Sequence, residues 1–479
     1  MSRPLMDTAG FWHVKTEREF GRKQGAKMST KEYTGNKITE GVIWKQILIF
    51  FVPILIGTFF QQLYNTVDAV VVGRFAGKEA LSSVGGSSGQ IINLVVGFFT
   101  GLSAGATVII SQYFGAGNRE KLEKALHTAY AFALVFGIAV GIAGVFVTPG
   151  LLGMMNTPQE LLADSMLYLR IYFSGLVFVL IYNMGSAILR AIGDSRRPLY
   201  YLMICCGINI VLDLLLVLVF DLGVMGAAVA TLFSQAVSAV LVTWTLMRRT
   251  PEMKLDPGKI RFRKDILIMM LKIGLPTGIQ SSMYSISNVI VQTALNNFGV
   301  DTMAAWTAFE KIDSIVWMIN GAFGIAATTF VGQNFGAGKW DRVRKGTREC
   351  LLMTLGSMMA LSVLITVFGG QLFRIFSSDI DVIAIGIQMV RIISPTYWIF
   401  GFIEIYSGSL RAQGSVLVST LLTMTGVCVL RIVWVAFIVP NGSLTQLIAC
   451  YPITWIVTAI AMVGYYIYKQ KRIMQEHRN

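Results

Sequence analysis

The sequence predicts an all-α integral membrane protein with twelve transmembrane helices, arranged as two parallel six-helix repeats. Three observations lead to this fold class: a hydrophobic composition, a one-sided distribution of positive charge, and motifs repeated at a constant distance. Of the 479 residues, 54% are hydrophobic and 14% are charged, whereas soluble domains carry about 25% charged residues. The mean hydropathy is +0.63. A soluble core could not enclose this many apolar helices, so the chain is expected to span a membrane.

The apolar residues form runs that are long enough to cross a bilayer. The run at residues 199–220 carries one charge, Asp213, and about 20 helical residues cross about 30 Å of hydrocarbon. The first span is too long for a perpendicular crossing, so we expect it to tilt or to bend at Pro53. The predicted spans lie at residues 43–72, 80–110, 126–148, 163–187, 199–220, 223–247, 266–296, 302–331, 350–369, 382–410, 414–439 and 444–468.

Positive charges lie almost entirely on one side of these spans. If the N-terminus is cytoplasmic, the segments on that side hold 32 of the 40 Lys and Arg residues, and the opposite side holds Arg74, Lys78 and Arg374. The positive-inside rule then places both termini in the cytoplasm of a multi-pass cell-membrane protein. Membrane orientation accounts for the net charge of +14, so we expect the lipid bilayer and no nucleic acid as a partner.

Three short motifs recur 221 residues apart. Phe114 in "SQYFGAG" corresponds to Phe335 in "GQNFGAG", "LRAIG" at 189–193 corresponds to "LRAQG" at 410–414, and Arg170 corresponds to Arg391. The chain is therefore predicted to contain two copies of a six-span unit. Because six is even, both copies enter the membrane from the same side, as parallel repeats do.

The repeat and the charge pattern together predict the domain organisation. A cytoplasmic, disordered tail is expected at 1–40, with Met28 as an alternative start. An N-terminal six-helix lobe follows at 41–247, a cytoplasmic linker at 248–265, a C-terminal six-helix lobe at 266–468 and a cytoplasmic tail at 469–479.

The duplicated Phe-Gly-Ala-Gly motif is interpreted as a turn and an orientation anchor. It follows the second span of each half, on the cytoplasmic side, and basic residues come after it. Gly115, Gly117, Gly336 and Gly338 permit tight backbone geometry. A nucleotide-binding loop would need a preceding strand or a P-loop lysine, and neither is present in the motif.

With these motifs at the ends of the second and eighth spans, the chain resembles the multidrug and toxic compound extrusion (MATE) family. The stretches "LYNTVDAVVVGRFAG" after Pro53 and "LRAIGDSRRP" after the fourth span add to the resemblance, which covers about residues 40–468. It implies a transporter whose two lobes rock to expose a binding site to either side of the membrane in turn.

Acidic residues inside the first-half spans are candidates for ion coupling. Asp68 and Asp213 have no acidic counterpart in the second repeat, where Trp434 stands opposite Asp213. An ionisable residue inside a membrane is costly and indicates function. Asp68, Asp213 and Thr231 all lie about 6–12 Å below the outer interface at 1.5 Å per residue, and Asn209 is one helical turn from Asp213. The alternative is a set of buried polar residues that satisfy one another.

The family resemblance implies the same residues. Asp68 matches the first-span Asp of the DinF-like branch, Asn209 and Asp213 match its fifth-span pair, and Thr231 falls at its sixth-span position. In that branch they are associated with coupling to a cation, H⁺ or Na⁺, and Asn183 in span 4 is a further candidate. The seventh span carries no acid within the membrane, so the C-lobe cation site of the NorM-like branch is not expected.

The second half holds the candidate substrate-binding acids Glu310, Asp313 and Glu404. Glu310 and Asp313 share a helical face at spacing i, i+3. Anionic groups in an apolar cleft suit a cationic amphiphile, and adaptable Met side chains suit its walls.

The predicted function is a secondary active multidrug exporter, acting as a monomer on amphiphilic, cationic compounds and needing no cofactor besides coupling H⁺ or Na⁺. A lipid-linked sugar flippase of the same broad superfamily is the main alternative, although its cavity would be expected to be cationic. A channel would not require coupling acids. An enzyme is not expected, because His13, His127 and His477 lie in tails or at a span edge, and neither a catalytic cluster nor metal-ligand spacing is evident.

Overall fold

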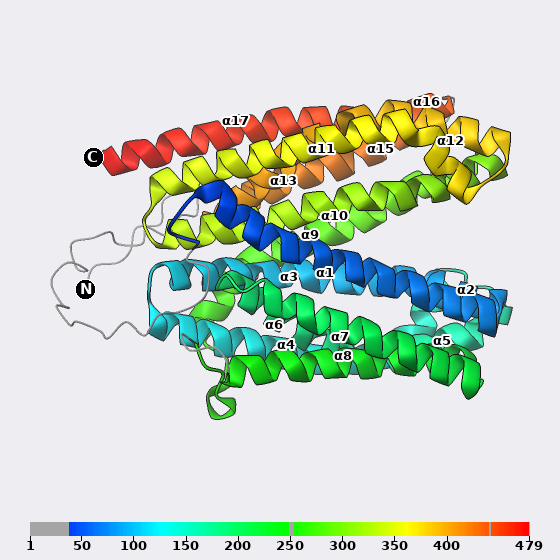
Figure 1. Ribbon diagram of the computed structural model, residues 1–479, viewed down its shortest axis with the longest axis horizontal. Helices are drawn as coiled ribbons and strands as arrows, with labels where there is room; N and C mark the ends of the chain where they lie inside the picture. Colours follow the sequence, from blue (N-terminus) through cyan, green and yellow to red (C-terminus); the bar gives the residue numbers. More distant parts are fainter. Residues whose placement is uncertain (1–37, 249–252, 440–441, 479) are drawn as a thin grey trace. The chain divides into compact units, whose positions relative to one another are not determined.

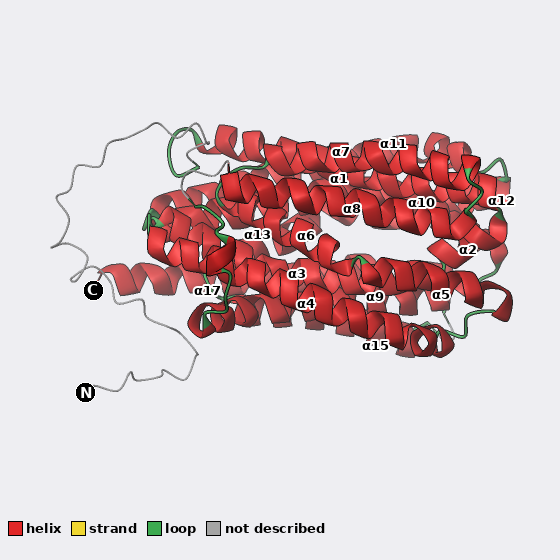
Figure 2. Ribbon diagram, turned by 90° about the horizontal axis from the view of Figure 1, so that it is seen from below, coloured by secondary structure: helices red, strands yellow, loops and turns green. Residues whose placement is uncertain are grey.

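The structure, a computed structural model, describes residues 38–248, 253–439 and 442–478. In this part of the chain the regular elements are all helical (Figure 2). The predicted disorder of the N-terminal tail and the alternative start at Met28 concern residues 1–37, which lie outside the described residues. The described residues form one compact unit, and the division into two lobes stays a prediction.

The first half of the chain, residues 43–248, consists of eight α-helices and two short π-helices. Its α-helices are α1 (Ile43–Val71), α2 (Lys78–Gly85), α3 (Ser87–Gly115), α4 (Arg119–Met154), α5 (Gln159–Ser174), α6 (Leu176–Ala191), α7 (Arg196–Asp213) and α8 (Gly223–Arg248). Two short π-helices, η1 (Val72–Ala76) and η2 (Leu214–Val219), continue α1 and α7.

The second half, residues 264–478, follows a 3₁₀ turn, η3 (Pro257–Lys259). Its α-helices are α9 (Lys264–Asn296), α10 (Val300–Gly336), α11 (Trp340–Phe376), α12 (Ile380–Ile393), α13 (Tyr397–Ala412), α14 (Val416–Thr423), α15 (Leu430–Phe437), α16 (Leu444–Ile448) and α17 (Cys450–Arg478). The 3₁₀ turn η4 (Ser394–Thr396) joins α12 to α13, and the π-helix η5 (Met424–Val429) joins α14 to α15.

The helices are long and apolar enough to cross a membrane. Among the described residues, 11 helical segments meet this criterion singly, and α5 with α6, bent by 49°, make a further broken span. This confirms the predicted all-α membrane fold. Large apolar side chains such as Phe146, Phe437 and Ile380 are 78–82% exposed on the helix surfaces. In a bilayer these side chains face lipid, where helices satisfy their own backbone hydrogen bonds.

Helix α1 makes contact with both halves of the chain (Figure 1). Near its start, Phe51 stacks on Phe323 of α10, with ring centroids 3.9 Å apart. Near its end, Val71 packs with Val217 and Val224 of the first half. Pro53 lies inside α1 without ending the helix. The helix that carries Asp68 is therefore in contact with both repeats.

A basic side chain of the second half binds the residues that precede α1. Arg342, in the first turn of α11, donates hydrogen bonds to the carbonyl oxygens of Ile38, Glu40 and Gly41 at 2.9–3.2 Å. Residues 38–40 were expected to belong to a disordered tail, and these bonds fix them against α11. Arginine suits this role because its guanidinium carries five N–H donors in one plane.

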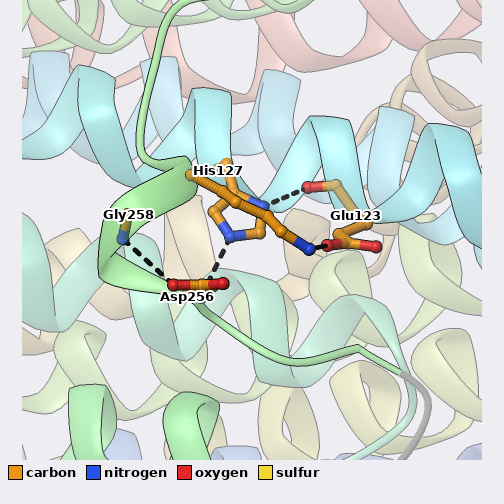
Figure 3. A network of polar contacts seen from close by, with 5 residues as sticks. Glu123, His127, Asp256 and Gly258 are labelled. Atoms are coloured by element: carbon orange, nitrogen blue, oxygen red, sulfur yellow. Dashed lines mark hydrogen bonds and ion pairs between the residues drawn. The ribbon is translucent and has the colours of Figure 1, made fainter.

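The linker between the halves is bound to α4 through His127 (Figure 3). The backbone N–H of Asp256 donates to His127 Nε2 at 3.0 Å, and His127 Nδ1 lies 2.7 Å from the carbonyl oxygen of Glu123. A backbone N–H can only donate, so Nε2 accepts and Nδ1 carries the proton. Nearby, Lys259 donates to the Glu123 carboxylate at 2.9 Å, and this hydrogen bond raises the pKa of Lys259.

His127→Ala is expected to loosen the linker. The substitution leaves the Asp256 N–H without its acceptor, at a cost of about 1 kcal/mol in the free energy of unfolding. Trypsin should then cut at Lys254 or Lys259 faster than in the wild type. Glu123→Gln is the matched control, because an exposed ion pair contributes about 0–1 kcal/mol. Equal cleavage rates for wild type and His127→Ala would contradict this role.

Candidate functional site

The two acids predicted in the first half lie against each other. Asp68 is near the end of α1 and is 8% exposed, and Asp213 is the last residue of α7 and is fully buried. Their carboxyl groups lie close enough to interact electrostatically. Two residues 145 positions apart in the sequence are thus brought to one place by the packing of α1 against α7.

Asn209, on the same helix as Asp213, and Thr231, on the neighbouring helix α8, extend this acidic pair. Asn209 is fully buried one helical turn before Asp213, and Thr231 of α8 is 3% exposed. The Tyr64 hydroxyl of α1 donates to Thr231 Oγ1 at 3.3 Å, which links α1 to α8. We define the cluster of Tyr64, Asp68, Asn209, Asp213 and Thr231 as the acidic cluster.

Four buried side-chain oxygens of the acidic cluster lack protein partners among the described residues. They are Asp68 Oδ1, both carboxylate oxygens of Asp213 and the side-chain oxygen of Asn209. Two ionised carboxylates cannot hydrogen-bond to each other, because both only accept. A shared proton or a bound cation would join them. Buried charges without such a partner are costly, so the arrangement is suited to binding H⁺ or a small hard cation.

Two tyrosines lie in or near the acidic cluster, and neither was predicted from the sequence. Tyr168 of α5 is 6% exposed and interacts electrostatically with Asp68 and Asp213. Tyr64 precedes Asp68 by four residues, which places both on one face of α1. That spacing was the available signal for Tyr64. For Tyr168, proximity to the acids depends on how α5 packs, which a single sequence does not reveal.

Each acid is followed by a π-helical segment. The π-helix η1 begins at Val72, four residues after Asp68, and η2 begins at Leu214, directly after Asp213. Short π-helical segments inside α-helices are rare and are frequently found at functional sites. Both therefore mark the end of the helix at which the acidic cluster lies.

Asn183 differs from the other predicted coupling residues in its hydrogen bonding. Its side-chain amide donates to the Val179 carbonyl at 2.9 Å, within its own helix α6. Its participation in ion coupling stays a prediction.

In the second half, Asp313 lies in an aromatic environment on α10. Trp317 Nε1 donates to Asp313 Oδ2 at 2.5 Å, and Tyr397 lies close enough to the same carboxyl to interact with it electrostatically. Glu310, one turn earlier on α10, is exposed and interacts electrostatically with Asp313. The structure therefore brings Glu310 and Asp313 together, as their spacing predicted.

A buried arginine lies near Asp313. Arg431 of α15 is 3% exposed, donates to Asn288 Oδ1 at 3.1 Å and lies 4.2 Å from the ring centroid of Tyr451. It also interacts electrostatically with Asp313. The sequence showed Arg431 as a charge within a span but gave no sign of its partners.

Glu404 is held separately. It lies in α13, 3.8 Å from Arg411 in an ion pair. It follows Tyr397 by seven residues, which is about 10 Å along the helix at 1.5 Å per residue. Of the three predicted substrate-binding acids, two are therefore grouped and one has its own basic partner.

Neither a histidine site nor a metal site is evident in the described residues. His127 uses both ring nitrogens to bind backbone groups. Groups of three or more His, Cys, Asp or Glu placed to hold a metal ion are absent from this part of the chain.

The MatE family model matches this chain in two segments, residues 53–215 and 276–437. Among relatives, the probable multidrug resistance protein YpnP of Bacillus subtilis is 30% identical over 82% of this chain and 88% of its own length. The probable multidrug resistance protein YoeA of the same organism is 28% identical over 90% of this chain and 95% of its own.

Solved structures share the fold. A MOP superfamily transporter from Pyrococcus furiosus superposes with a TM-score of 0.86 at 22% identity, covering 92% of this chain and 99% of its own. A multidrug resistance MATE transporter in an outward-facing conformation also gives a TM-score of 0.86 at 22% identity, covering 93% and 100%.

Proposed function

Because this chain belongs to the MatE family of multidrug and toxic compound extrusion transporters, we propose that it exports amphiphilic cations in exchange for H⁺ or Na⁺. The family consists of multi-pass membrane transporters and not of enzymes. Two relatives that align over most of this chain's length are named as probable multidrug resistance proteins, which supports drugs as the substrate class.

The observation that carries the coupling proposal is the acidic cluster. Asp68 and Asp213 lie against each other with buried oxygens that lack protein partners. An ion arriving from outside binds between these carboxyl groups and changes their net charge. Neutralising a buried charge alters how stably α1 packs against α7 and α8. The halves then change their relative position, as in alternating access.

The position of the acids supports the DinF-like branch. The acidic cluster draws on α1, α7 and α8, which match the first, fifth and sixth spans of that branch. Within the apolar part of α9 no acid is present, and Asp265 lies in its first turn. We therefore place ion coupling in the first half of the chain.

Substrate binding in the second half rests on Glu310 and Asp313. These acids lie near Trp317 and Tyr397, and aromatic rings attract cations through their faces. A carboxylate next to aromatic side chains suits a cationic amphiphile, because a buried cation needs a counter-charge. Glu404 is a weaker candidate, since Arg411 already partners it.

Dye efflux with the two gradients dissipated separately tests the function. Cells that express the chain, or inverted vesicles prepared from them, should lose ethidium transport when the coupling gradient collapses. Only one of the two gradients, H⁺ or Na⁺, should be required. Export that persists without either gradient would indicate a different energy source or a channel. Transport of lipid-linked sugars without any drug efflux would favour a flippase instead.

We further propose that both termini and the linker are cytoplasmic, and labelling tests this orientation. Lys254→Cys places a thiol on an exposed linker residue, and Ser378→Cys places one in the exposed connection between α11 and α12. In intact cells an impermeant thiol reagent should label Ser378→Cys and spare Lys254→Cys. The five native cysteines are buried, so background labelling should be low. The reverse pattern would invert the topology.

A further inference from the structure

The repeated motif forms two equivalent hydrogen bonds between the halves. Gln112 of α3 donates to the carbonyl oxygen of Ala412 at 2.7 Å, and Gln333 of α10 donates to the carbonyl oxygen of Ala191 at 2.8 Å. Gln112 and Gln333 are 221 residues apart, and so are Ala191 and Ala412. Each half therefore binds the other through the same pair of positions.

Glycines allow the same helix ends to meet closely. A methyl group on Gly115 would overlap the backbone of Gln333, and one on Gly336 would overlap the backbone of Gln112. Gly115 and Gly336 are also 221 residues apart. The turn predicted for this motif is made by Gly117 and Gly338, whose φ angles are +67° and +68°. The first glycine of each motif instead provides contact between the halves.

We propose that these glutamines and glycines form the cytoplasmic gate of the transporter, held closed in this structure. We define the gate as Gln112, Gly115, Gln333 and Gly336 with the carbonyl groups of Ala191 and Ala412. The proposal rests on the alternating access of the proposed function. It assigns a conformational role to a motif that the sequence alone marked as a turn.

The acceptors of these bonds suit a contact that must open and close. Ala191 and Ala412 are the last residues of α6 and α13, where carbonyl groups have no partner within the helix. When the halves separate, water can replace the glutamine amide at each carbonyl. Exchange with water makes a hydrogen bond modest in net free energy, so the gate can be opened by differences in ion and substrate binding.

The neighbouring seam between α3 and α9 closes the same side. Gly105 of α3 and Gly274 of α9 are so close that a methyl group on either would overlap the backbone of the other helix. Tyr113 donates to Met269 Sδ at 3.9 Å, nearer the gate. The linker also lies at this end, bound to α4 through His127. These contacts place the closed part at the end predicted to be cytoplasmic.

Spin labels at the outer end report which end of the transporter is open. Lys78→Cys on α2 and Ser378→Cys after α11 are exposed positions, one in each half. Double electron–electron resonance between them reports the populations with the outer ends apart and together. The variants are Gln112→Met, Gln333→Met and the double variant, because Met retains the side-chain length and removes the donor.

We expect each single variant to shift the ratio of outward-open to inward-open protein about fivefold toward inward-open, the effect of one hydrogen bond. The double variant should shift it about 25-fold if the two bonds act independently. Gln388→Met is the matched control, since it removes a hydrogen bond to Thr445 within the second half. This control should leave the populations unchanged. Equally unchanged populations in the double variant would overturn the gate.

Gly336→Leu provides a second test by steric means. Leucine cannot fit against Gln112, so the inward-open state should dominate, while Gly356→Leu, at an exposed glycine with open space around it, should have no effect. Retention of the wild-type populations in Gly336→Leu would also contradict the gate. The label distances require no substrate. A shift without any drug transport would therefore leave the gate standing and overturn the proposed function alone.

Discussion

Asp213→Asn and Asp68→Asn are each expected to reduce gradient-driven export to the level of cells that lack the protein, with nearly normal amounts of folded protein. Asparagine retains the shape of aspartate but does not ionise, so the acidic cluster loses a site for the coupling ion. Asp213 is fully buried without a protein partner for either oxygen. Removing its charge should leave folding intact or stabilise it, because an unpaired buried charge is costly.

The measurement is ethidium efflux together with the melting temperature of the purified protein. Saturating Na⁺, or a lower pH if the coupling ion is H⁺, should raise the melting temperature of the wild type by mass action. Neither should raise the melting temperature of either variant. Asp221→Asn is the control: Asp221 is exposed shortly after η2, with φ of +51°, a conformation that Asn also adopts. Near-normal efflux from Asp68→Asn or Asp213→Asn would remove that residue from the coupling mechanism.

Asp313→Asn is expected to weaken export of monovalent cations more than tenfold relative to neutral substrates. In this variant a cation bound in the apolar site has no counter-charge from residue 313. In wild type and variant alike, the cation must also leave against a membrane potential that is negative inside, at about 2.3 kcal/mol per charge per 100 mV. The neutral substrate faces neither cost. Export rates of ethidium and of a neutral dye in the same cells give the comparison.

Two further variants sharpen this test. Glu310→Gln should show the same selectivity, because Glu310 lies one turn from Asp313 on α10. Glu404→Gln should affect both substrates alike and less strongly, since it breaks the pair with Arg411. If Asp313→Asn lowers both substrates equally, the residue acts through folding or gating and not through recognition of charge.

The membrane fold was predictable because spanning a bilayer requires long apolar helices, and such helices are visible in a sequence. The predicted span at 163–187 corresponds to α5 and α6, which bend by 49°. A hydropathy pattern records apolar length and says nothing of this bend. The interruption at Gly175, the C-cap of α5, depends on contacts with neighbouring helices.

The acidic cluster was partly predictable, because depth along each helix can be counted from the sequence. Asp68, Asp213 and Thr231 were expected at similar depths. The structure places the two acids close together, and Tyr64, on the same helix as Asp68, donates to Thr231. Rotation of a helix about its axis and the choice of its neighbours are set by packing. For that reason the contacts of Tyr168 and Arg431 could not be inferred.

The duplicated glycine motif shows the same limit. A sequence can indicate where the chain turns, and Gly117 and Gly338 do turn with positive φ angles. Contact of Gly115 with Gln333 joins residues 218 positions apart. The repeat itself carried the missing information, because equivalent positions in two parallel copies can meet across the axis that relates them.

Coupled flux in proteoliposomes tests the central claim most directly. Purified protein is reconstituted without any ion gradient, and a gradient of ethidium alone is imposed across the membrane. An antiporter must then drive the coupling ion in the opposite direction, seen as a change in luminal pH or Na⁺, and Asp68→Asn must abolish this flux. Ethidium movement without counterflow of H⁺ or Na⁺ in the wild type, or equal counterflow in Asp68→Asn, would contradict ion exchange at the acidic cluster.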